Sequence, residues 1–225
     1  MNSKLGEKME TNGFSLNRAS TAVVAVDIQK DFTEAYDGVL AIPGTNKAFL
    51  KEVNDTCLSL KESGFLIYAS QDWHPFDHSS FASQNIGRKI FETQGGTTYW
   101  PDHCIQGTDG SALLLSEGIV DVVIRKGQDR DFDSYSAFYD DSQRSTGLSE
   151  ELKARHIDTL IVFGLATDVC VKATVLDAVN DGFKVCLLTN LCLGVNPEGS
   201  KTALEEMNKA GVLFFEDAHS TLLLS

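Results

Sequence analysis

The sequence predicts an α/β protein with a three-layer, doubly wound, mostly parallel sheet of about six strands. Short apolar, β-branched segments alternate along the chain with segments of helical periodicity. The apolar segments also lack the in/out alternation of a sheet that faces water on one side. Such a β–α alternation requires right-handed crossovers, which place helices on both faces of a parallel sheet. The expected strands are Thr21–Val26, Phe65–Ser70, Ile119–Ile124, Thr159–Phe163, Lys184–Thr189 and Val212–Phe215.

Helical spacing of apolar residues predicts the helices between these strands. In the first helix Phe49 and Leu60 fall on one face, and Gly64 supplies a stop at the carboxyl end. Segments 71–118 and 128–146 do not fit the alternation and are rich in Asp, Ser, Gly, His and aromatic residues. Long loops in a compact domain are usually functional or disordered, and the aromatic residues favour function. The expected helices are Thr45–Glu62, Leu148–His156, Asp168–Asn180 and Gly199–Ala210.

Length and charge indicate one globular domain, residues 21–225, after a polar N-terminal tail, residues 1–20. A chain of 225 residues has room for a single α/β domain with one sizeable core. The formal net charge of −13 would repel nucleic-acid phosphates and anionic membrane surfaces, so neither is expected as a partner. A small neutral or cationic substrate fits better, and a homo-oligomer is left open.

The apolar runs and the cysteines point to the cytoplasm. No run approaches the ~20 residues that span a bilayer. Residues 1–20 lack the apolar core of a signal peptide. The five cysteines have no paired spacing, which suits a reducing compartment better than a disulfide framework.

Residues with chemical potential follow several of the expected strands. Asp27 comes after the first strand, Asp72 and His74 after the second, Lys126 after the third and Cys170 shortly after the fourth. Ligands of an open parallel sheet bind outside the carboxyl ends of its strands. We therefore expect a carboxylate, a pair of metal ligands, a lysine and a thiol to converge at one edge of the sheet.

Cys170 is the candidate nucleophile. It is expected in the first turn of the helix that follows the fourth strand. Partial positive charge and free N–H groups at a helix N-terminus depress a thiol pKa and can hold an oxyanion. The alternative for an isolated cysteine is a packing residue of the core, and Cys57 and Cys186 are interpreted in that way.

Asp27 and Lys126 are the candidate partners of this thiol. An ionised carboxylate at the end of an apolar strand is costly to bury without a partner. Asp27 could be the general base for Cys170, with Lys126 keeping the carboxylate charged, or the two could form a structural ion pair. Together with the thiol they match the pattern of nucleophile, base and orienting group that covalent catalysis needs.

Asp72 and His74 are candidate metal ligands, because alternate residues of an extended segment point to the same side. His103 could supply a third donor. Two histidines and one carboxylate suit Zn, Fe or Mn and leave positions open for water or substrate. The Asp-x-His spacing alone is a weak signal. Further candidates are His78, Asp102 and Cys104.

Five short motifs carry a resemblance to a known family. They are VDIQKDF at 26–32, QDWHP at 71–75, WPDHC at 100–104, RKG at 125–127 and GLATDVC at 164–170. Each motif alone is a modest signal, but all of them occur in order at suitable spacing. The chain thereby resembles the nicotinamidase (pyrazinamidase) branch of the isochorismatase-like cysteine hydrolase superfamily, from about Thr21 to Thr221.

The resemblance implies the isochorismatase-like hydrolase fold and a metal-dependent amidohydrolase. Such an enzyme would convert nicotinamide to nicotinate and ammonia through a cysteine thioester, in NAD salvage. The implied catalytic residues are Asp27, Lys126 and Cys170. The implied ligands of one divalent metal ion, Zn²⁺ before Fe²⁺ or Mn²⁺, are Asp72, His74 and His103. This ion would bind the pyridine nitrogen.

The resemblance also implies the walls of the substrate site. Phe32 and Trp100 would line the ring pocket, and the backbone N–H groups of Ala166 and Cys170 would form the oxyanion hole. The peptide bond between Leu165 and Ala166 would be cis.

Several alternatives stay open from the sequence. His78 could be an additional metal ligand, and segment 128–146, with Tyr135, Phe138 and Tyr139, could cover the site or be an ordinary surface loop. Rival functions are a metal-free isochorismatase-like or N-carbamoyl amide hydrolase and a non-catalytic scaffold. The thiol argues against isochorismatases, which do not require it, and the candidate metal ligands argue against metal-free amidases.

Overall fold

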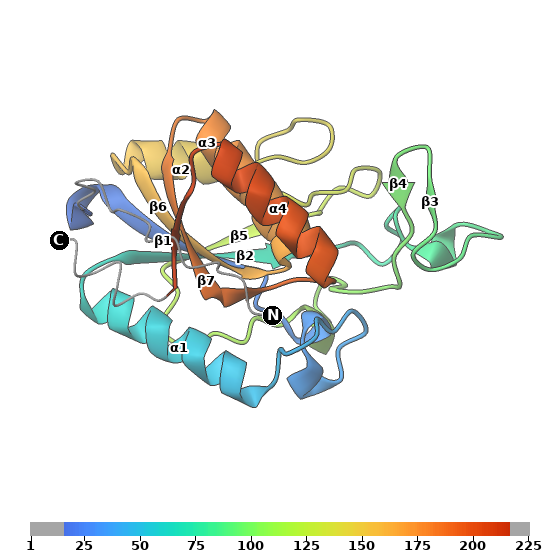
Figure 1. The fold of residues 1–225 in the computed structure, drawn as a ribbon. Coiled ribbons are helices and arrows are strands. Elements are labelled where there is room, and N and C mark those ends of the chain that lie inside the picture. The colour runs from blue at the N-terminus through green and yellow to red at the C-terminus, as the bar shows by residue number, and fades with distance from the viewer. Residues whose placement is uncertain (1–15, 217–225) are drawn as a thin grey trace, which may run out of the picture.

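The computed structural model describes residues 16–216, which form a six-stranded sheet of order β5-β2-β1-β6-β7-β8 (Figure 1). Every neighbouring pair in this sheet is parallel. The strands are β1 (Thr21–Val26), β2 (Leu66–Asp72), β5 (Val122–Lys126), β6 (Thr159–Leu165), β7 (Lys184–Leu193) and β8 (Leu213–Phe215). The predicted fold class is therefore confirmed, with strand ends that differ by a few residues from those expected. Most of the predicted polar tail, residues 1–15, lies outside the described residues.

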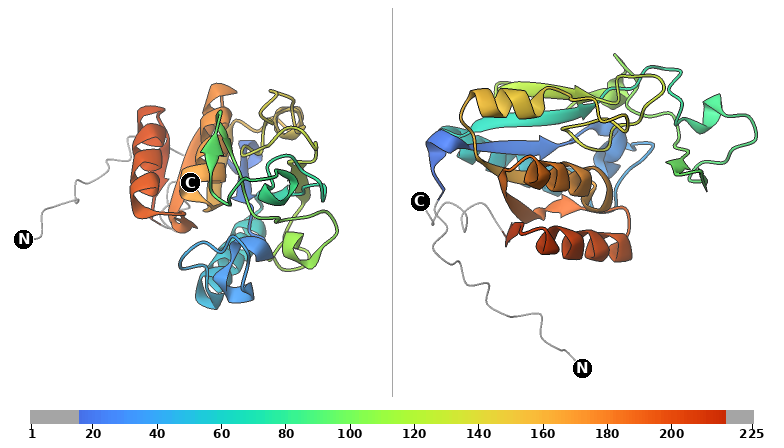
Figure 2. Two further views of the ribbon diagram at one scale, coloured as in Figure 1. Left: turned by 90° about the vertical axis from the view of Figure 1, so that its right-hand side faces the viewer. Right: turned by 90° about the horizontal axis from the view of Figure 1, so that it is seen from above.

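Helices cover both faces of the sheet (Figures 1 and 2). Alternate residues of β1 separate the two cores: Val23 packs on the side of α1, and Val24 packs on the side of the other three helices. Cys57 and Cys186 are fully buried in the core beside α1, as interpreted from the sequence. The helices are α1 (Lys47–Glu62), α2 (Leu148–Ala154), α3 (Lys172–Asn180) and α4 (Pro197–Lys209).

Two long segments emerge at the carboxyl edge of the sheet. The first connects β2 to β5 and contains a small antiparallel pair, β3 (Thr93–Gln94) and β4 (Thr97–Thr98), which projects from the body (Figure 1). The second connects β5 to α2. Short 3₁₀ turns occur at Arg18–Ser20, Lys30–Phe32, Glu34–Tyr36, Ala82–Gln84 and Asp109–Ser111.

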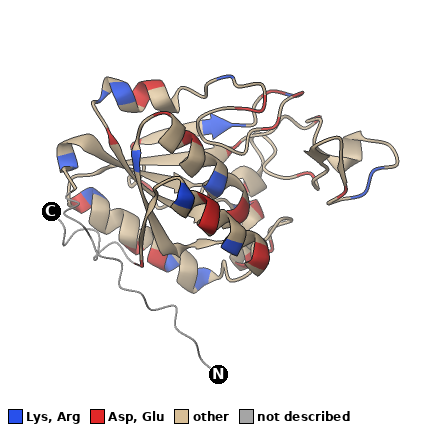
Figure 3. Cartoon of the chain, turned by 45° about the horizontal axis from the view of Figure 1, so that its top comes forward, with Lys and Arg blue, Asp and Glu red and all other residues tan. Residues whose placement is uncertain are grey.

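Charged residues of both signs are interspersed on the surfaces of the helices (Figure 3). Among residues 16–216, no helix is long and apolar enough to cross a membrane.

Gly164 allows β6 to approach β1 closely. Its φ is +135°, and a Cβ at this position would lie 2.1 Å from the carbonyl oxygen of Val26. We expect Gly164→Ala to lower the free energy of unfolding by roughly 2–5 kcal/mol, because it combines backbone strain with overpacking between strands. Urea denaturation would measure the loss.

Gly211→Ala is the matched control for this prediction. Gly211 also has a positive φ, of +89°, but a Cβ there would meet nothing within 4 Å. Its replacement should therefore cost only about 1 kcal/mol. Equal losses in the two variants would show that the contact with Val26 is unimportant.

Candidate active site and metal centre

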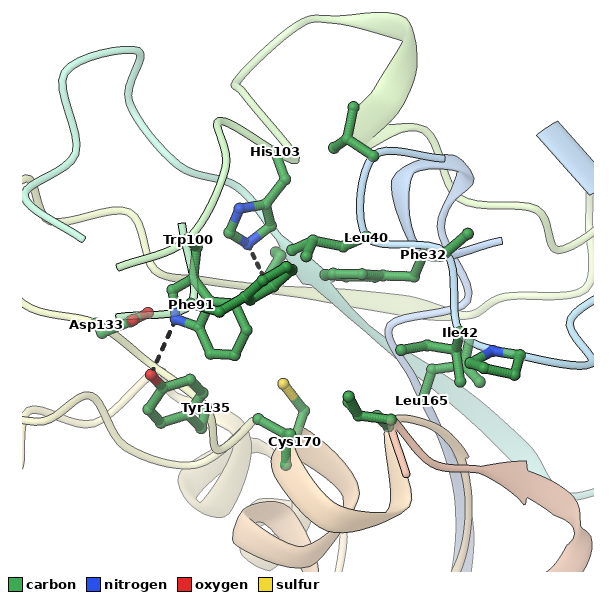
Figure 4. Close-up of a pocket in the computed structure, with 17 residues that line it drawn as sticks. Phe32, Leu40, Ile42, Phe91, Trp100, His103, Asp133, Tyr135, Leu165 and Cys170 are labelled. Atoms are coloured by element: carbon green, nitrogen blue, oxygen red, sulfur yellow. Dashed lines mark hydrogen bonds and ion pairs between the residues drawn. The ribbon is translucent and has the colours of Figure 1, made fainter. Parts of the chain in front are cut away.

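A cavity of about 270 Å³ lies at the carboxyl edge of the sheet (Figure 4). Its wall is mostly apolar, but Asp72, His103 and Cys170 border it together. Phe32 and Trp100, which were predicted to line a ring pocket, also border this cavity. An apolar cavity with a few convergent polar groups is the usual form of a small-molecule site.

The three predicted catalytic residues meet beside this cavity. Asp27 directly follows β1, Lys126 ends β5, and Cys170 lies in the turn between β6 and α3. The Nζ atom of Lys126 is 2.9 Å from Oδ2 of Asp27 and 3.5 Å from Sγ of Cys170. The side chains of Asp27 and Lys126 are completely buried. Three strand ends that are distant in sequence thus bring a base, a cation and a thiol into contact.

The turn that carries Cys170 differs from the predicted α-helical first turn. Residues Thr167–Val171 form a π-helical turn, and α3 begins only at Lys172. The peptide bond between Leu165 and Ala166 is cis, as the resemblance implies. Both Ala166 and Cys170 border the cavity, so the two expected oxyanion donors belong to its wall.

The environment of Asp27 suits a proton acceptor. Burial raises the pKa of Asp27 above its usual range, although Lys126 opposes the rise. Oδ1 accepts a hydrogen bond of 2.6 Å from Ser70 Oγ. Oδ2 forms the ion pair with Lys126, but among the described residues no donor is oriented to make a hydrogen bond to it. A carboxylate with a raised pKa and a free lone pair is well placed to take the thiol proton.

Cys170 does not have the depressed pKa that was expected from a position at a helix N-terminus. Burial raises the pKa of the thiol well above its usual range, and the negative charges of Asp27 and Asp72 add to the rise. Lys126 opposes this effect without overcoming it. That expectation was therefore wrong, because burial and two carboxylates outweigh the polarity of the turn. The thiol stays protonated until a neighbouring base removes its proton.

Lys126 neutralises two carboxylates rather than one. Its Nζ donates to Oδ1 of Asp72 at 2.5 Å and to the carbonyl oxygen of Ser134 at 2.9 Å, in addition to its ion pair with Asp27. Burial works against the lysine charge, but Asp27 and Asp72 together raise the pKa of Lys126 well above its usual range. The ammonium is therefore charged and joins the candidate catalytic residues to the candidate metal ligands.

The predicted metal ligands form a compact set of donor atoms. Oδ2 of Asp72 is 3.6 Å from Nε2 of His74 and 3.9 Å from Nε2 of His103. Nδ1 of His74 lies 2.9 Å from the Gly127 carbonyl oxygen, and Nδ1 of His103 lies 2.8 Å from that of Pro101. When each Nδ1–H donates to its carbonyl, the Nε2 lone pairs face the aspartate.

The protonation of His103 and Asp72 also suits a metal, whereas, against the opposing effect of burial, Asp72 raises the pKa of His74. Burial, with the neighbouring His74, lowers the pKa of His103 to about 4. Burial opposes the charge of Asp72, but Lys126 and His74 hold the pKa of this carboxyl well below its usual range. A neutral imidazole and an ionised carboxylate are the forms that bind metal. The donor atoms of Asp72, His74 and His103 lie within 4.8 Å of one another and fit a divalent cation with nitrogen and oxygen ligands.

His78 supports this cluster from outside. Its ring lies 4.4 Å, centroid to centroid, from that of His74. Its two nitrogens contact Oγ of Ser80 at 2.8 Å and the carbonyl oxygen of Phe132 at 3.2 Å. The donor atoms of His74, His78 and Asp133 also lie within 4.8 Å of one another. Both ring nitrogens of His78, however, already have polar partners in Ser80 and Phe132.

The other sequence candidates make structural contacts. Asp102 accepts a hydrogen bond of 2.6 Å from Ser83 Oγ. Cys104 has a φ of +45°, and its backbone N–H donates to Oδ2 of Asp31 at 2.7 Å. Since Cys104 directly follows His103, this bond fixes the turn that presents the histidine.

Sequence reasoning missed residues that hold the site from behind. The amide of Gln29 donates to the carbonyl oxygen of Asp72 at 2.9 Å and accepts from its N–H at 2.8 Å. Asp31 holds the turn after His103, and Ser70 orients Asp27. Gln29 and Asp31 lie within the 26–32 motif, which was a usable signal. Ser70, a small polar residue inside an apolar strand, had a weaker one.

Segment 128–146 combines the two interpretations that the sequence left open. Tyr135 borders the cavity, and its Oη accepts a hydrogen bond of 3.1 Å from Nε1 of Trp100. Phe138 is instead completely buried in the core beside α2, α3 and α4. The segment therefore covers part of the site as a fixed wall that is anchored in the core.

Comparisons with known proteins show which family this chain and its fold are similar to. The sequence model of the isochorismatase domain family matches residues 21–216 of this chain. The nicotinamidase of Escherichia coli is 43% identical over 204 residues, which cover 86% of this chain and 93% of that protein. A nicotinamidase/pyrazinamidase structure from Acinetobacter baumannii is 37% identical with a TM-score of 0.80 and covers 90% of this chain and 98% of that one. A pyrazinamidase from Pyrococcus horikoshii, solved in complex with zinc, is 33% identical with a TM-score of 0.75, and the match covers 87% and 98% of the two chains.

Proposed function

The chain belongs to the isochorismatase family, and from this premise we propose that it is a nicotinamidase, an amidohydrolase that converts nicotinamide to nicotinate and ammonia. One observation carries the proposal beyond family membership: Asp27, Lys126 and Cys170 meet at the edge of a cavity that Asp72 and His103 also border. A thiol, a base and a candidate metal site in one apolar cavity suit the hydrolysis of a small aromatic amide.

The acylation half of the reaction uses Asp27 as base and then as acid. Asp27 accepts the Cys170 proton as the thiolate attacks the carboxamide carbon. The N–H groups of Ala166 and Cys170 hold the resulting oxyanion. When this intermediate collapses, the nitrogen receives the proton from Asp27 and leaves as ammonia, so that a thioester on Cys170 remains. Lys126 keeps the carboxylate charged and stabilises negative charge on the sulfur.

The deacylation half repeats the same proton transfers with water. Asp27 takes a proton from a water molecule as its oxygen attacks the thioester carbon. Collapse of the second tetrahedral species breaks the C–S bond and releases nicotinic acid, which loses its carboxyl proton to water and becomes nicotinate. The proton on Asp27 then returns to the Cys170 sulfur, which restores the starting state.

Ring recognition falls to the aromatic wall and to the metal-binding residues. Phe32 and Trp100 provide apolar surface against the pyridine ring. A divalent ion held by Asp72, His74 and His103, Zn²⁺ before Fe²⁺ or Mn²⁺, would supply a Lewis-acid contact that fixes the pyridine nitrogen. The same three residues argue against the metal-free alternatives. We further propose that the reaction serves NAD salvage in the cytoplasm; all five cysteines are free, which supports a reducing compartment.

Ammonia release from nicotinamide tests the proposal directly. Purified protein loaded with Zn²⁺, Fe²⁺ or Mn²⁺ should release one ammonia and form one nicotinate per substrate consumed, with pyrazinamide as a second substrate. If the metal-loaded protein released no ammonia from either amide, the proposed function would be wrong.

Removal of one metal ligand is expected to weaken metal binding. We expect His103→Ala to lower the affinity for Zn²⁺ by at least roughly 100-fold, because it removes one of only three protein donors. Competition with a chromophoric chelator would measure this affinity, and elemental analysis would give the metal content. His156→Asn, a change at an exposed histidine, should leave both quantities unchanged. Full metal content in the His103 variant would exclude this residue as a ligand.

A further inference from the structure

Phe91 borders the cavity but has no part in the mechanism above. It lies in residues 84–99, here called the arm, which contain β3 and β4 and project from the body (Figures 1 and 2). Phe91 is 62% exposed. In Figure 4 it points into the cavity between Trp100 and Phe32. Small-molecule sites are lined mainly by apolar and aromatic side chains, so an aromatic ring at the mouth of this cavity can form part of the ligand-binding surface.

The backbone of Phe91 adopts a conformation that bulky residues avoid. Its φ is +66°, in the left-handed region. Its N–H donates to the carbonyl oxygen of Tyr99 at 2.7 Å, and the next residue, Glu92, accepts a hydrogen bond of 2.9 Å from Arg88. The arm thus holds a phenylalanine where a glycine would fit without strain. Strain of this kind persists where the position of a side chain matters for function.

The contacts of Phe91 continue the aromatic wall. Its ring meets that of Trp100 edge to face, with centroids 6.0 Å apart and planes at 84°. The indole N–H of Trp100 donates to the Tyr135 hydroxyl. The backbone carbonyl oxygen of Trp100 accepts a hydrogen bond of 2.8 Å from the N–H of Ala82, at the base of the arm. Phe91 is therefore fixed relative to the ring pocket by both its backbone and its side chain.

We propose that Phe91 is a specificity-determining residue, which closes the outer side of the ring pocket and restricts it to single-ring amides. The inference rests on the proposed function. In nicotinamide, ring carbon C5 is meta both to the pyridine nitrogen and to the ring carbon that bears the carboxamide, so it lies opposite the side of the ring that carries the two anchor points. A substituent on C5 must therefore extend away from Cys170 and the metal ligands, toward the mouth of the cavity that Phe91 closes.

Phe91→Gly removes the aromatic ring without disturbing the backbone, because glycine adopts a positive φ without strain. Its effects therefore report on the ring alone. We expect the KM for nicotinamide to rise roughly tenfold through loss of an apolar wall, and kcat to stay within about twofold. The ratio of kcat/KM for 5-phenylnicotinamide to that for nicotinamide should rise by at least roughly tenfold. The Tm should not fall. Phe91→Leu, which keeps an apolar side chain, should have intermediate values.

The matched control is Ile90→Ala, a change at an exposed arm residue that does not border the cavity. It should leave KM and the substrate ratio unchanged. An unchanged ratio in Phe91→Gly, or a lower Tm together with a lower kcat, would overturn the proposal. A wild-type protein that releases no ammonia would instead refute the proposed function. Titration calorimetry of the two amides with wild type and Phe91→Gly would then still measure the selectivity.

Discussion

Replacement of Cys170 by alanine is expected to lower kcat for nicotinamide by at least about 10³-fold, because no other group can form the thioester. Asp27 and Lys126 would remain in place and could only assist direct attack by water. The stability should change little, since the side chain lost is small. Ammonia release measures the first effect and thermal unfolding the second.

Cys57→Ala is the control for loss of a buried sulfur. Cys57 is fully buried in the core beside α1, away from the cavity, so its replacement should cost roughly 1 kcal/mol of stability and no activity. Hydroxylamine adds a chemical readout, because it converts a thioester to nicotinohydroxamate and frees the thiol. The hydroxamate should form with wild type and be absent with the Cys170 variant. Near-normal turnover in that variant would refute covalent catalysis.

The ends of the strands explain why the candidate site could be predicted. Asp27, Asp72 and Lys126 each follow or end an apolar run, and parallel strands put those ends on one edge. The strands and the helices that cover the sheet could also be predicted, because each is a run of residues with a local hydrophobic pattern. His103 lies in a long loop where periodicity carries no information. From the residues alone it was only a possible third donor, and the family resemblance then implied that it is a metal ligand.

Other features depend on contacts between distant segments and have no local signal. Lys126 was expected to pair with Asp27, but it also binds Asp72 and the Ser134 carbonyl oxygen, which depends on the packing of segment 128–146. The raised pKa of the Cys170 thiol follows from burial and from two carboxylates that are supplied by other strands. Phe91 reaches the cavity only through the hydrogen-bonded geometry of the arm. Sequence patterns identify residue types at strand ends, but not which of them share a partner.

Lys126 should therefore matter for folding as well as for catalysis. Lys126→Met keeps the length of the side chain but leaves Asp27 and Asp72 buried without their cation. We expect the free energy of unfolding at neutral pH to fall by roughly 3–5 kcal/mol, which is typical when one partner of a buried ion pair is removed. We also expect kcat to fall by at least about 10²-fold, because Asp27 will hold a proton and cannot act as base. Urea denaturation and ammonia release would measure the two effects.

The pH dependence distinguishes lost charge from lost packing. Burial already raises the pKa of Asp27 while Lys126 opposes it, so removal of the lysine raises this pKa further. A carboxyl group whose folded-state pKa exceeds its unfolded value of about 3.9 binds more protons in the folded state, and the variant therefore regains stability as pH falls through the raised pKa. A loss of the same size from pH 5 to pH 8 would indicate packing alone. Lys51→Met, at an ion pair whose side chains are 74% and 63% exposed, should cost at most about 0.5 kcal/mol throughout this range, because water already screens that pair.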